Sequence, residues 1–300
     1  MTLLGHDLKK IIFMKFSIIT PVYNGEKYIA ETIESILSQK GNFEVEYIII
    51  DGGSTDKTVE IIKKYAKKYP IKWISEKDKG MYSAINKGFS MATGDIYAWL
   101  NSDDLYLPGA MEIVSKTFSK YPDIKWLKGI NAAINESSKI TKINPCYVYN
   151  QEWIALGVYG KNAYFIHQES VFWRNELWET AKGIDENLKL AGDYYLWTQF
   201  GKHTPLWSIN VPLACFRKRK GQLSDDMNNY RKEQSIISPS PKNWFIFRIK
   251  LFFWLKSKTS SMFNPFFLLL YKLLFWNRNK YYIKIQNSQP IIKKTRSYIA

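Results

Sequence analysis

Two adjacent carboxylates, Asp103 and Asp104, follow a short apolar run and could bind a divalent cation. Five of the six residues at 96–101 are aliphatic or aromatic, which is typical of a strand buried on both faces. The two acids then stand just past the carboxyl end of that strand, where open α/β sheets bind ligands. Neighbouring hard oxygen ligands suit Mg²⁺ or Mn²⁺ bridged to a diphosphate. A solvated turn is the alternative, because Asn-Ser-Asp-Asp is also good turn chemistry.

A third carboxylate, Asp51, opens the Gly-rich segment DGGSTD directly after the apolar run 45–50. A carboxylate there can accept a hydrogen bond from a ribose hydroxyl or a base N–H, and the glycines permit close approach. A Gly-rich turn capped by Ser54 or Thr55 is the alternative. The fingerprint G-x-G-x-x-G and the phosphate loop G-x-x-x-x-G-K-[ST] are both missing, so hydride transfer and P-loop phosphoryl transfer lack support. We therefore expect a metal ion to hold the phosphates.

The elements that must position these acids are strands alternating with amphipathic helices. Apolar runs at 16–21, 45–50, 71–75 and 96–101 predict strands, and helical spacing of apolar residues predicts three helices between them. This alternation predicts an α/β fold with right-handed crossovers, a mostly parallel Rossmann-like sheet and helices on both faces. All the strand-to-helix loops then meet at one edge, where the expected crevice gathers Tyr23, Asp51, Asp78, Asp103 and Asp104.

Five motifs in this order and spacing resemble the family 2 glycosyltransferases of the GT-A fold. They are SIITPVYN at 17–24, IDGGSTD at 50–56, EKDKG at 76–80, NKG at 86–88 and NSDD at 101–104. The resemblance covers about residues 16–230. It implies an inverting transferase that takes a sugar from a nucleotide-diphospho-sugar, here expected to be a UDP-sugar, with Mg²⁺ or Mn²⁺ as cofactor.

The resemblance also assigns roles to residues. It implies that Asp103 faces ribose or metal and that Asp104 is the principal metal ligand. Ser83 stands where close relatives usually have Asp, and a hydroxyl cannot supply that charge, so no role is carried over to it. The nucleotide-sugar-binding positions that it implies, besides Asp103, are Thr20, Pro21, Tyr23, Glu26, Asp51, Asp78, Lys79 and Asn86.

The second half of the chain is expected to hold the acceptor. Asp193, in AGDYYLW at 191–197, matches the catalytic base of the family, and a plain helix N-cap is the alternative. His167 and Gln168, in HQESVFWR at 167–174, are candidates to line the acceptor or diphosphate site. Arg217 is a further candidate, because the basic loop 216–224 could close over a diphosphate; a solvated charge run is the alternative.

Charge is unevenly distributed along the 300 residues. The net charge is +16, yet no acidic residue follows Glu233, and residues 234–300 carry 12 Lys and Arg. Aromatic and basic stretches at 244–255 and 265–276 are too short and too charged to span a bilayer. They predict amphipathic helices on an anionic membrane surface, with a helical hairpin packed on the body as the alternative. We expect no nucleic-acid binding, because the aromatic residues cluster instead of being spaced along a basic groove.

The sequence thus predicts three parts: a short leader at 1–15, a GT-A glycosyltransferase domain at 16–235, and a basic, aromatic helical tail at 236–300. Met14 is the expected start of the domain, and residues 1–13 are expected to be dispensable. Cys146 and Cys215 stand far apart, which fits a reducing compartment. We expect a cytoplasmic enzyme, attached to the inner face of the cell membrane, that extends a lipid-linked glycan. A catalytically inactive nucleotide-sugar-binding or membrane scaffold protein is the alternative.

Overall fold

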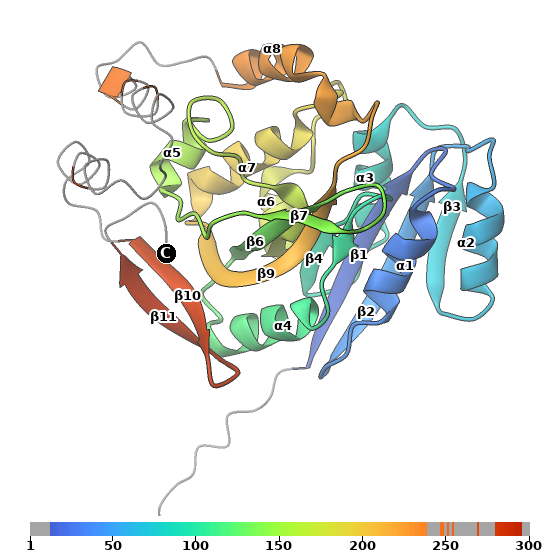
Figure 1. Cartoon of the computed structure of the whole chain (residues 1–300), viewed down its shortest axis with the longest axis horizontal. Coiled ribbons are helices and arrows are strands. Elements are labelled where there is room, and N and C mark those ends of the chain that lie inside the picture. The colour runs from blue at the N-terminus through green and yellow to red at the C-terminus, as the bar shows by residue number, and fades with distance from the viewer. Residues whose placement is uncertain are drawn as a thin grey trace, which may run out of the picture.

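The computed structural model describes residues 13–238 and 280–295, together with residues 247, 248, 251, 254 and 269. Its first part is the expected α/β unit, in which the parallel strands lie in the order β3-β2-β1-β4. β2 and β3 follow β1 on one side, whereas β4 lies on the other side of β1. Right-handed crossovers therefore place α1 and α2 on one face of the sheet and α3 on the other (Figure 1). The bounds are β1 (Met14–Val22), α1 (Ile29–Leu37), β2 (Phe43–Asp51), α2 (Thr58–Ala66), β3 (Ile71–Ser75), α3 (Met81–Ser90) and β4 (Ile96–Trp99).

The second part extends this sheet with strands of both directions. Its order continues from β4 through β8, β6, β9 and β10 to β11. β8 pairs antiparallel with β4 and β6, whereas β6 and β9 are parallel, so the parallel arrangement is regular only in the first part. The elements are β5 (Leu105–Tyr106), α4 (Ala110–Lys120), β6 (Trp126–Ile134), β7 (Ile140–Ile143), α5 (Gln151–Ala155), η1 (Gln168–Ser170), β8 (Val171–Arg174), α6 (Asn175–Ala181), α7 (Gly192–His203), β9 (Trp207–Arg217), η2 (Leu223–Asp225) and α8 (Met227–Ile237).

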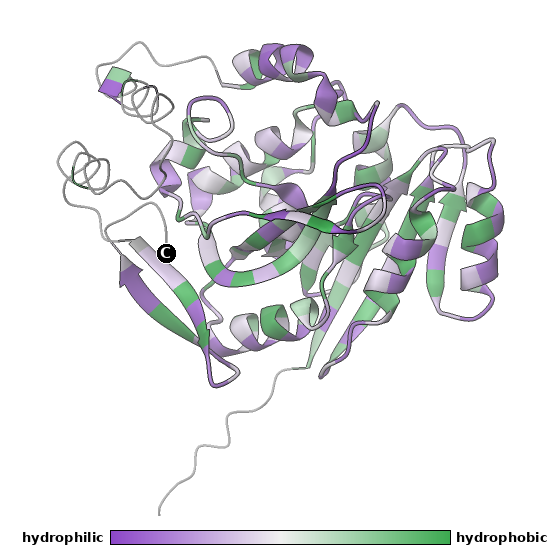
Figure 2. Ribbon diagram, viewed as in Figure 1, coloured by the Kyte–Doolittle hydropathy of each residue, from purple (hydrophilic) through white to green (hydrophobic). Residues whose placement is uncertain are grey.

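The core lies between this sheet and its helices. The central strands are hydrophobic along their length and the outer helices are hydrophilic on their exposed sides (Figure 2). Three tryptophans, Trp99, Trp126 and Trp173, are among the largest fully buried side chains, and Trp197 of α7 stacks on Trp99 at 5.8 Å between ring centroids. Such aromatic contacts add to the burial of apolar area. They fix α7, and with it Asp193, against the end of β4.

The loops before α1 and α4 each contain a residue with a left-handed backbone. Asn24 has a left-handed backbone (φ 50°), and its side-chain oxygen accepts a hydrogen bond from the Thr55 N–H at 2.9 Å, so it joins two loops and α1 begins at Ile29. α4 begins at Ala110, directly after Gly109, whose φ angle is 78°.

The last described segment is a β-hairpin and not a helix, which corrects part of the expected helical tail. β10 (Lys280–Gln286) and β11 (Gln289–Thr295) pair antiparallel around Asn287 and Ser288, whose φ angles are 50° and 57°. Two such residues form the two-residue turn that suits the twist of a hairpin. β10 also pairs parallel with β9, so the hairpin completes one edge of the sheet (Figure 1). The stretches 244–255 and 265–276, expected to be helices, lie outside the described residues apart from a few isolated positions.

The hairpin is expected to contribute to stability through Ile283, which is 0% exposed. Replacing a buried isoleucine by alanine removes apolar contacts and leaves a cavity, so Ile283→Ala should lower the free energy of unfolding by about 2–5 kcal/mol. Urea unfolding followed by tryptophan fluorescence measures this change. Lys284→Ala, on the exposed face of the same strand, is the control and should unfold like the wild type. Equal stability of all three proteins would contradict the packing of the hairpin on the sheet.

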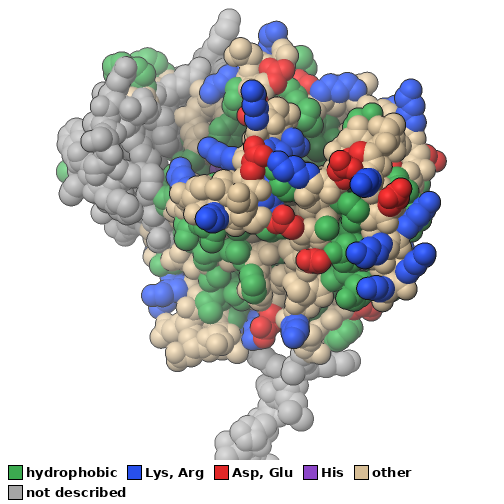
Figure 3. Space-filling view, turned by 45° about the vertical axis from the view of Figure 1, so that its right-hand side comes forward, with side chains coloured by type: hydrophobic (Ala, Val, Ile, Leu, Met, Phe, Trp, Pro, Cys, Tyr) green, Lys and Arg blue, Asp and Glu red, His purple; other side chains and the backbone are tan. Residues whose placement is uncertain are grey.

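Charge on the body is mixed, as the composition indicates. Basic and acidic side chains lie interspersed over the face drawn in Figure 3 and are not separated into large patches of one sign. Cys146 and Cys215 are both buried and free. No helix in the described ranges has the length and hydrophobicity needed to cross a membrane.

Candidate active site

The loops that follow β1, β2 and β3 meet at one edge of the sheet, as expected. Asp51, the last residue of β2, is fully buried, and its carboxylate accepts hydrogen bonds from the N–H groups of Gly53 (3.2 Å) and Ser54 (3.0 Å) and from the Ser75 hydroxyl (2.6 Å). Asp51 itself therefore caps the turn of the Gly-rich loop, whereas the alternative expected Ser54 or Thr55 to do so.

Gly52 lies against a second acid of this edge. A Cβ atom at residue 52 would stand 2.9 Å from the Asp78 Oδ2, which is too close for any larger side chain without movement. Asp78 in turn accepts a hydrogen bond from the Gly80 N–H at 2.8 Å. Asp78 thus joins the Asp51 loop, and these two expected donor-binding residues are neighbours in space.

The residues expected after β1 divide into buried and exposed ones. Thr20 and Pro21 are buried in β1, and the Thr20 hydroxyl accepts a hydrogen bond from the Tyr47 hydroxyl at 3.1 Å. Tyr23 is 63% exposed at the end of the strand and leaves its ring face open to a planar ligand. Glu26 accepts a hydrogen bond from the Lys57 N–H at 2.9 Å, which turns its carboxylate toward the start of α2.

Two other expected donor-binding residues hold a distant loop. The Asn86 side chain donates to the Ile184 carbonyl (2.8 Å) and accepts from the Ile184 N–H (3.0 Å). The Lys79 carbonyl accepts a hydrogen bond from the Lys189 ammonium at 3.3 Å. Both contacts connect the first part of the chain to the segment before α7, so Asn86 has a structural explanation that its motif did not suggest.

The two acids after β4 point in opposite directions. Asp104 is only 1% exposed, and its carboxylate accepts hydrogen bonds from the Arg217 backbone N–H (2.9 Å) and the Asn101 side chain (3.3 Å). Burial, together with the nearby Asp103 and Glu169 carboxylates, raises the pKa of Asp104 well above its usual range. A bound divalent cation would lower this pKa, so the role expected for Asp104 as the principal metal ligand stays a prediction, although both of its oxygens have partners inside the protein.

Asp103 is the accessible acid of the pair. Its side chain is 18% exposed, and Arg219 Nε donates to its Oδ2 at 2.6 Å. No hydrogen bond from the described residues reaches its other oxygen. Within those residues, no three His, Cys, Asp or Glu side chains converge as a ready-made metal cluster. Mg²⁺ is commonly held by one or two carboxylates, water and substrate phosphates, so one accessible carboxylate at this edge fits such an ion.

Arg217 is placed inside the protein and not over the crevice. Its side chain is fully buried, with the guanidinium 4.3 Å from the Tyr28 ring centre and 3.0 Å from the Glu31 carboxylate. It also donates to the Asp103 carbonyl at 2.8 Å. Arg217 therefore fixes the backbone that carries the acidic pair, and Arg219, two residues later, is the arginine that a diphosphate could reach.

His167 and Gln168 stand at the start of η1, on the same side of the sheet edge. Gln168 is buried and its side-chain amide donates a hydrogen bond to the Trp99 carbonyl at the end of β4. Burial, together with Lys128, Lys142 and Lys218, lowers the pKa of His167 to about 3, so its imidazole is neutral near pH 7. Gln168 thus holds η1 against the end of β4, and His167 is a neutral hydrogen-bonding group.

The next residue of η1, Glu169, is a buried acid that lies near both Asp104 and Asp193. Burial and the nearby Asp193 raise the pKa of Glu169 to about 7, although Lys128 opposes the change. Because Glu169 also raises the pKa of Asp104, it lies within electrostatic range of both Asp104 and Asp193. Glu169 therefore lies near both the candidate base and the buried acid of the pair.

Asp193 stands in the first turn of α7, one residue after its start, so it is not the N-cap, which is Ala191. Its Oδ1 accepts hydrogen bonds from the Tyr194 N–H (2.7 Å) and the Tyr230 hydroxyl (3.1 Å). Burial raises the pKa of Asp193 to about 6. A carboxylate with that pKa is still ionised near neutral pH and is basic enough to take a proton in a transition state.

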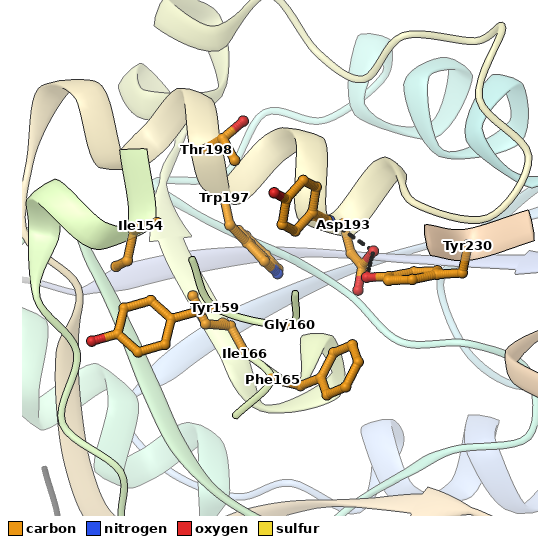
Figure 4. Close-up of a pocket in the computed structure, with 10 residues that line it drawn as sticks. Ile154, Tyr159, Gly160, Phe165, Ile166, Asp193, Trp197, Thr198 and Tyr230 are labelled. Carbon is orange, nitrogen blue, oxygen red and sulfur yellow. Dashed lines mark hydrogen bonds between the residues drawn. The ribbon is translucent and has the colours of Figure 1, made fainter. Parts of the chain in front are cut away.

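The pocket beside Asp193 is lined largely by aromatic rings. Figure 4 shows Asp193 and Tyr230 side by side, with Phe165 and Trp197 on the walls. The rings of Phe165 and Tyr230 are 6.0 Å apart and tilted by 55°. Aromatic faces next to a carboxylate suit a sugar ring, which presents apolar C–H groups and hydroxyls together.

Three residues of this site were not predicted from the sequence. Arg219 lies in the basic loop 216–224, and the sequence alone does not distinguish it from Arg217. Glu169 stands between the polar residues Gln168 and Ser170, so no local pattern indicates that it is buried. Tyr230 is 37 residues from Asp193 along the chain, and no local pattern could join them.

Comparison with known proteins shows the family of the chain. A family model described as glycosyl transferase family 2 matches residues 17–155. An uncharacterized glycosyltransferase of Rickettsia typhi is 32% identical over 225 residues, which are 74% of this chain and 69% of that relative. Chondroitin synthase of Escherichia coli is 30% identical over 67% of this chain, but over only 28% of its own length.

Solved structures agree in fold. TarS of S. aureus, in complex with UDP-GlcNAc, superposes with a TM-score of 0.58 at 20% identity and covers 84% of this chain and 75% of its own. At that identity the likeness supports the fold alone, which is the GT-A arrangement expected from the motifs. The identity to the Rickettsia relative over most of both chains shows the family as well. The chain therefore belongs to glycosyltransferase family 2 and is a transferase enzyme.

Proposed function

We propose that this enzyme is an inverting, metal-dependent glycosyltransferase that moves a sugar from a UDP-sugar to a hydroxyl of a lipid-linked glycan. One observation carries the proposal: Trp197 of α7 stacks on Trp99 of β4, which holds Asp193, whose pKa is about 6, against the end of the strand that leads into Asp103. The UDP-sugar is supported by TarS, whose structure holds UDP-GlcNAc, and the glycan acceptor by the name chondroitin synthase.

The donor is proposed to lie along the edge formed by the loops after β1, β2 and β4. The exposed ring of Tyr23 would cover the base, and the Asp51 loop, with Asp78 against it, would border the nucleoside. Asp103 would hold Mg²⁺ or Mn²⁺, which when bound supplies positive charge to the leaving diphosphate. Arg219, now paired with Asp103, would share its charge with the diphosphate, because arginine binds phosphate oxygens well.

Asp193 is proposed to act as the general base. It takes the proton of the acceptor hydroxyl as that oxygen forms a bond to the anomeric carbon, from the face opposite the diphosphate. The bond between the anomeric carbon and the diphosphate oxygen breaks, and its electron pair leaves with the nucleotide. Attack from the opposite face inverts the anomeric configuration. The pocket of Figure 4 is too small to enclose a sugar, so the acceptor would lie at its mouth, next to Asp193 and the aromatic rings around it.

The nucleotide specificity can be tested by binding. Calorimetric titration of the full-length protein with UDP, GDP, CDP and dTDP in the presence of Mn²⁺ should show the tightest binding for UDP. Replacing Tyr23, whose ring is open to the ligand, by alanine should weaken UDP binding by about tenfold, since stacking on a base contributes about 1–3 kcal/mol. Tyr69→Ala, an exposed tyrosine elsewhere on the surface, is the control. Tighter binding of another nucleotide would contradict the UDP assignment.

The membrane location is also a proposal, and it rests on the charge of the chain after α8. Residues 239–279 contain seven Lys and Arg and no acidic residue. Each basic group near an anionic bilayer contributes about 1 kcal/mol of attraction. We propose that this segment holds the enzyme peripherally at the inner face of the cell membrane, close to its lipid-linked acceptor.

This location predicts a clear result with vesicles. Replacing residues 239–279 by a Gly/Ser linker of equal length, which keeps the β10–β11 hairpin, should release the protein from vesicles rich in anionic lipid. Flotation with anionic and with neutral vesicles measures the bound fraction. The wild type should float with the anionic vesicles at low salt and less at high salt. A linker variant that still floats fully would contradict the role of this segment.

A further inference from the structure

α8 packs across the first turn of α7 and contacts the candidate base directly. The Tyr230 hydroxyl donates to Asp193 Oδ1 at 3.1 Å, and the Tyr194 N–H reaches the same oxygen at 2.7 Å. Both donors therefore bind one oxygen of the carboxylate. This arrangement fixes the rotation of the side chain and leaves the other oxygen for the acceptor hydroxyl. Figure 4 shows the Tyr230 ring lying next to the Asp193 carboxylate at the side of the pocket.

One turn further along α8, Glu233 holds the backbone that leads into α7. Its carboxylate accepts hydrogen bonds from three successive N–H groups, those of Lys189 (2.9 Å), Leu190 (3.0 Å) and Ala191 (2.8 Å). The first N–H groups of a helix lack partners within it, and Ala191 as N-cap has no side-chain cap of its own. Glu233 supplies an anion at this positive end from another helix.

The end of α8 is anchored as well. The Ser238 hydroxyl donates to the Leu156 carbonyl at 2.9 Å, and the Lys161 ammonium donates to the Ser238 carbonyl at 3.1 Å. Both partners belong to the loop that follows α5 and borders the pocket. The helix is thus held at its far end while its middle turn carries Tyr230 and Glu233 to the base.

We propose that Tyr230 and Glu233 are positioning residues for sugar transfer: Glu233 fixes the turn that carries Asp193, and Tyr230 orients its carboxylate toward the acceptor. This inference rests on the proposed role of Asp193 as the base. It assigns a function to α8, a helix that lies beyond the residues matched by the family model.

The two residues act on the ionisation of Asp193 in opposite directions. The Tyr230 hydrogen bond stabilises the carboxylate and lowers its pKa, whereas the negative charge of Glu233 raises it. The other titratable groups in range are Tyr82 from α3 and Glu169 from η1. Removing the Tyr230 hydroxyl should therefore raise the pKa of Asp193, and neutralising Glu233 should lower it.

The pH dependence of kcat, measured with the full-length enzyme, tests this directly. The acidic limb of the wild-type profile is expected near pH 6, the pKa of Asp193. In Tyr230→Phe it should move to higher pH by about 0.5 to 1 unit, the size expected for one lost hydrogen bond. In Glu233→Gln it should move to lower pH. The KM for the donor should stay unchanged in both, because neither residue borders the nucleotide edge.

Tyr121→Phe is the matched control, since it deletes the same atom from a tyrosine that bonds the Pro290 carbonyl, far from Asp193. Its profile should equal that of the wild type. Wild-type profiles in both α8 variants, with Asp193→Asn inactive, would overturn the inference and leave the proposed base intact. Full activity of Asp193→Asn would instead overturn the base itself. If Glu233→Gln fails to fold, Tyr230→Phe, which keeps the ring and its packing, still decides the question.

Discussion

Replacing Asp193 by asparagine is expected to slow sugar transfer by about 10²- to 10⁴-fold, the usual cost of losing a general base. Asparagine keeps the shape and can still accept the hydrogen bonds of Tyr194 and Tyr230 at Oδ1. It cannot take a proton from the acceptor hydroxyl. The fall should appear in kcat, with donor affinity nearly unchanged, because Asp193 lies on the acceptor side of the site.

Donor titration by calorimetry beside a transfer assay reports these two effects separately. Asp185→Asn is the matched control, since Asp185 is an exposed acid in the loop before α7. It should transfer sugar at the wild-type rate. Normal transfer by Asp193→Asn, or a large loss in Asp185→Asn alone, would show that another acid is the base.

Substitution of the two acids after β4 should give different results, because the structure places them differently. Asp103→Asn removes the accessible charge that would face the metal and the diphosphate. Interactions of charged groups of this kind contribute about 1.5–3 kcal/mol, so donor affinity in the presence of Mn²⁺ should fall about tenfold or more. The protein should remain folded, since this side chain is partly exposed.

Asp104→Asn should retain donor and metal binding, because asparagine still offers an oxygen to the Arg217 N–H inside the protein. Asp104→Ala, by contrast, leaves that buried N–H without a partner and should lower the free energy of unfolding by about 1–3 kcal/mol. Calorimetry with donor and Mn²⁺, together with urea unfolding, distinguishes the two roles. Loss of metal binding in Asp104→Asn but not in Asp103→Asn would identify Asp104 as the principal ligand, as the family motif suggests.

Much of the first half of the fold could be predicted from the sequence, for physical reasons. Strands covered on both faces are almost continuously apolar, so β1, β2 and β4 stand out from the amphipathic helices between them. Parallel strands joined by helices bring all their carboxyl ends to one edge. That rule placed Asp51, Asp78 and Asp103 together without any knowledge of contacts.

The directions of side chains at the site could not be predicted in the same way. Asp103 and Asp104 are adjacent in the chain, and the choice of which one turns inward depends on Arg217, more than one hundred residues away. Tyr230 reaches Asp193 by a similarly long connection. Long-range contacts of this kind leave no periodic signal in a single sequence.

The hairpin of residues 280–295 was missed for a different reason. Its alternating apolar residues Tyr281, Ile283 and Ile285 and its Asn-Ser turn are ordinary hairpin signals. They were read together with the basic, aromatic stretch before them, as one helical tail. Composition averaged over 65 residues hid a local pattern with a period of two.

The measurement that tests the central claim most directly is release of nucleotide from a nucleotide sugar by the full-length enzyme, with a lipid-linked glycan as acceptor. A panel of nucleotide sugars should be assayed with Mn²⁺, with Mg²⁺ and with a chelator, and the product examined by NMR at its new anomeric carbon. We predict that UDP is released in a reaction that requires the acceptor and the metal, and that the new linkage has the inverted anomeric configuration. A retained configuration would contradict Asp193 as a base on the face opposite the diphosphate. A folded protein that releases no nucleotide from any donor would contradict catalysis and support the scaffold alternative.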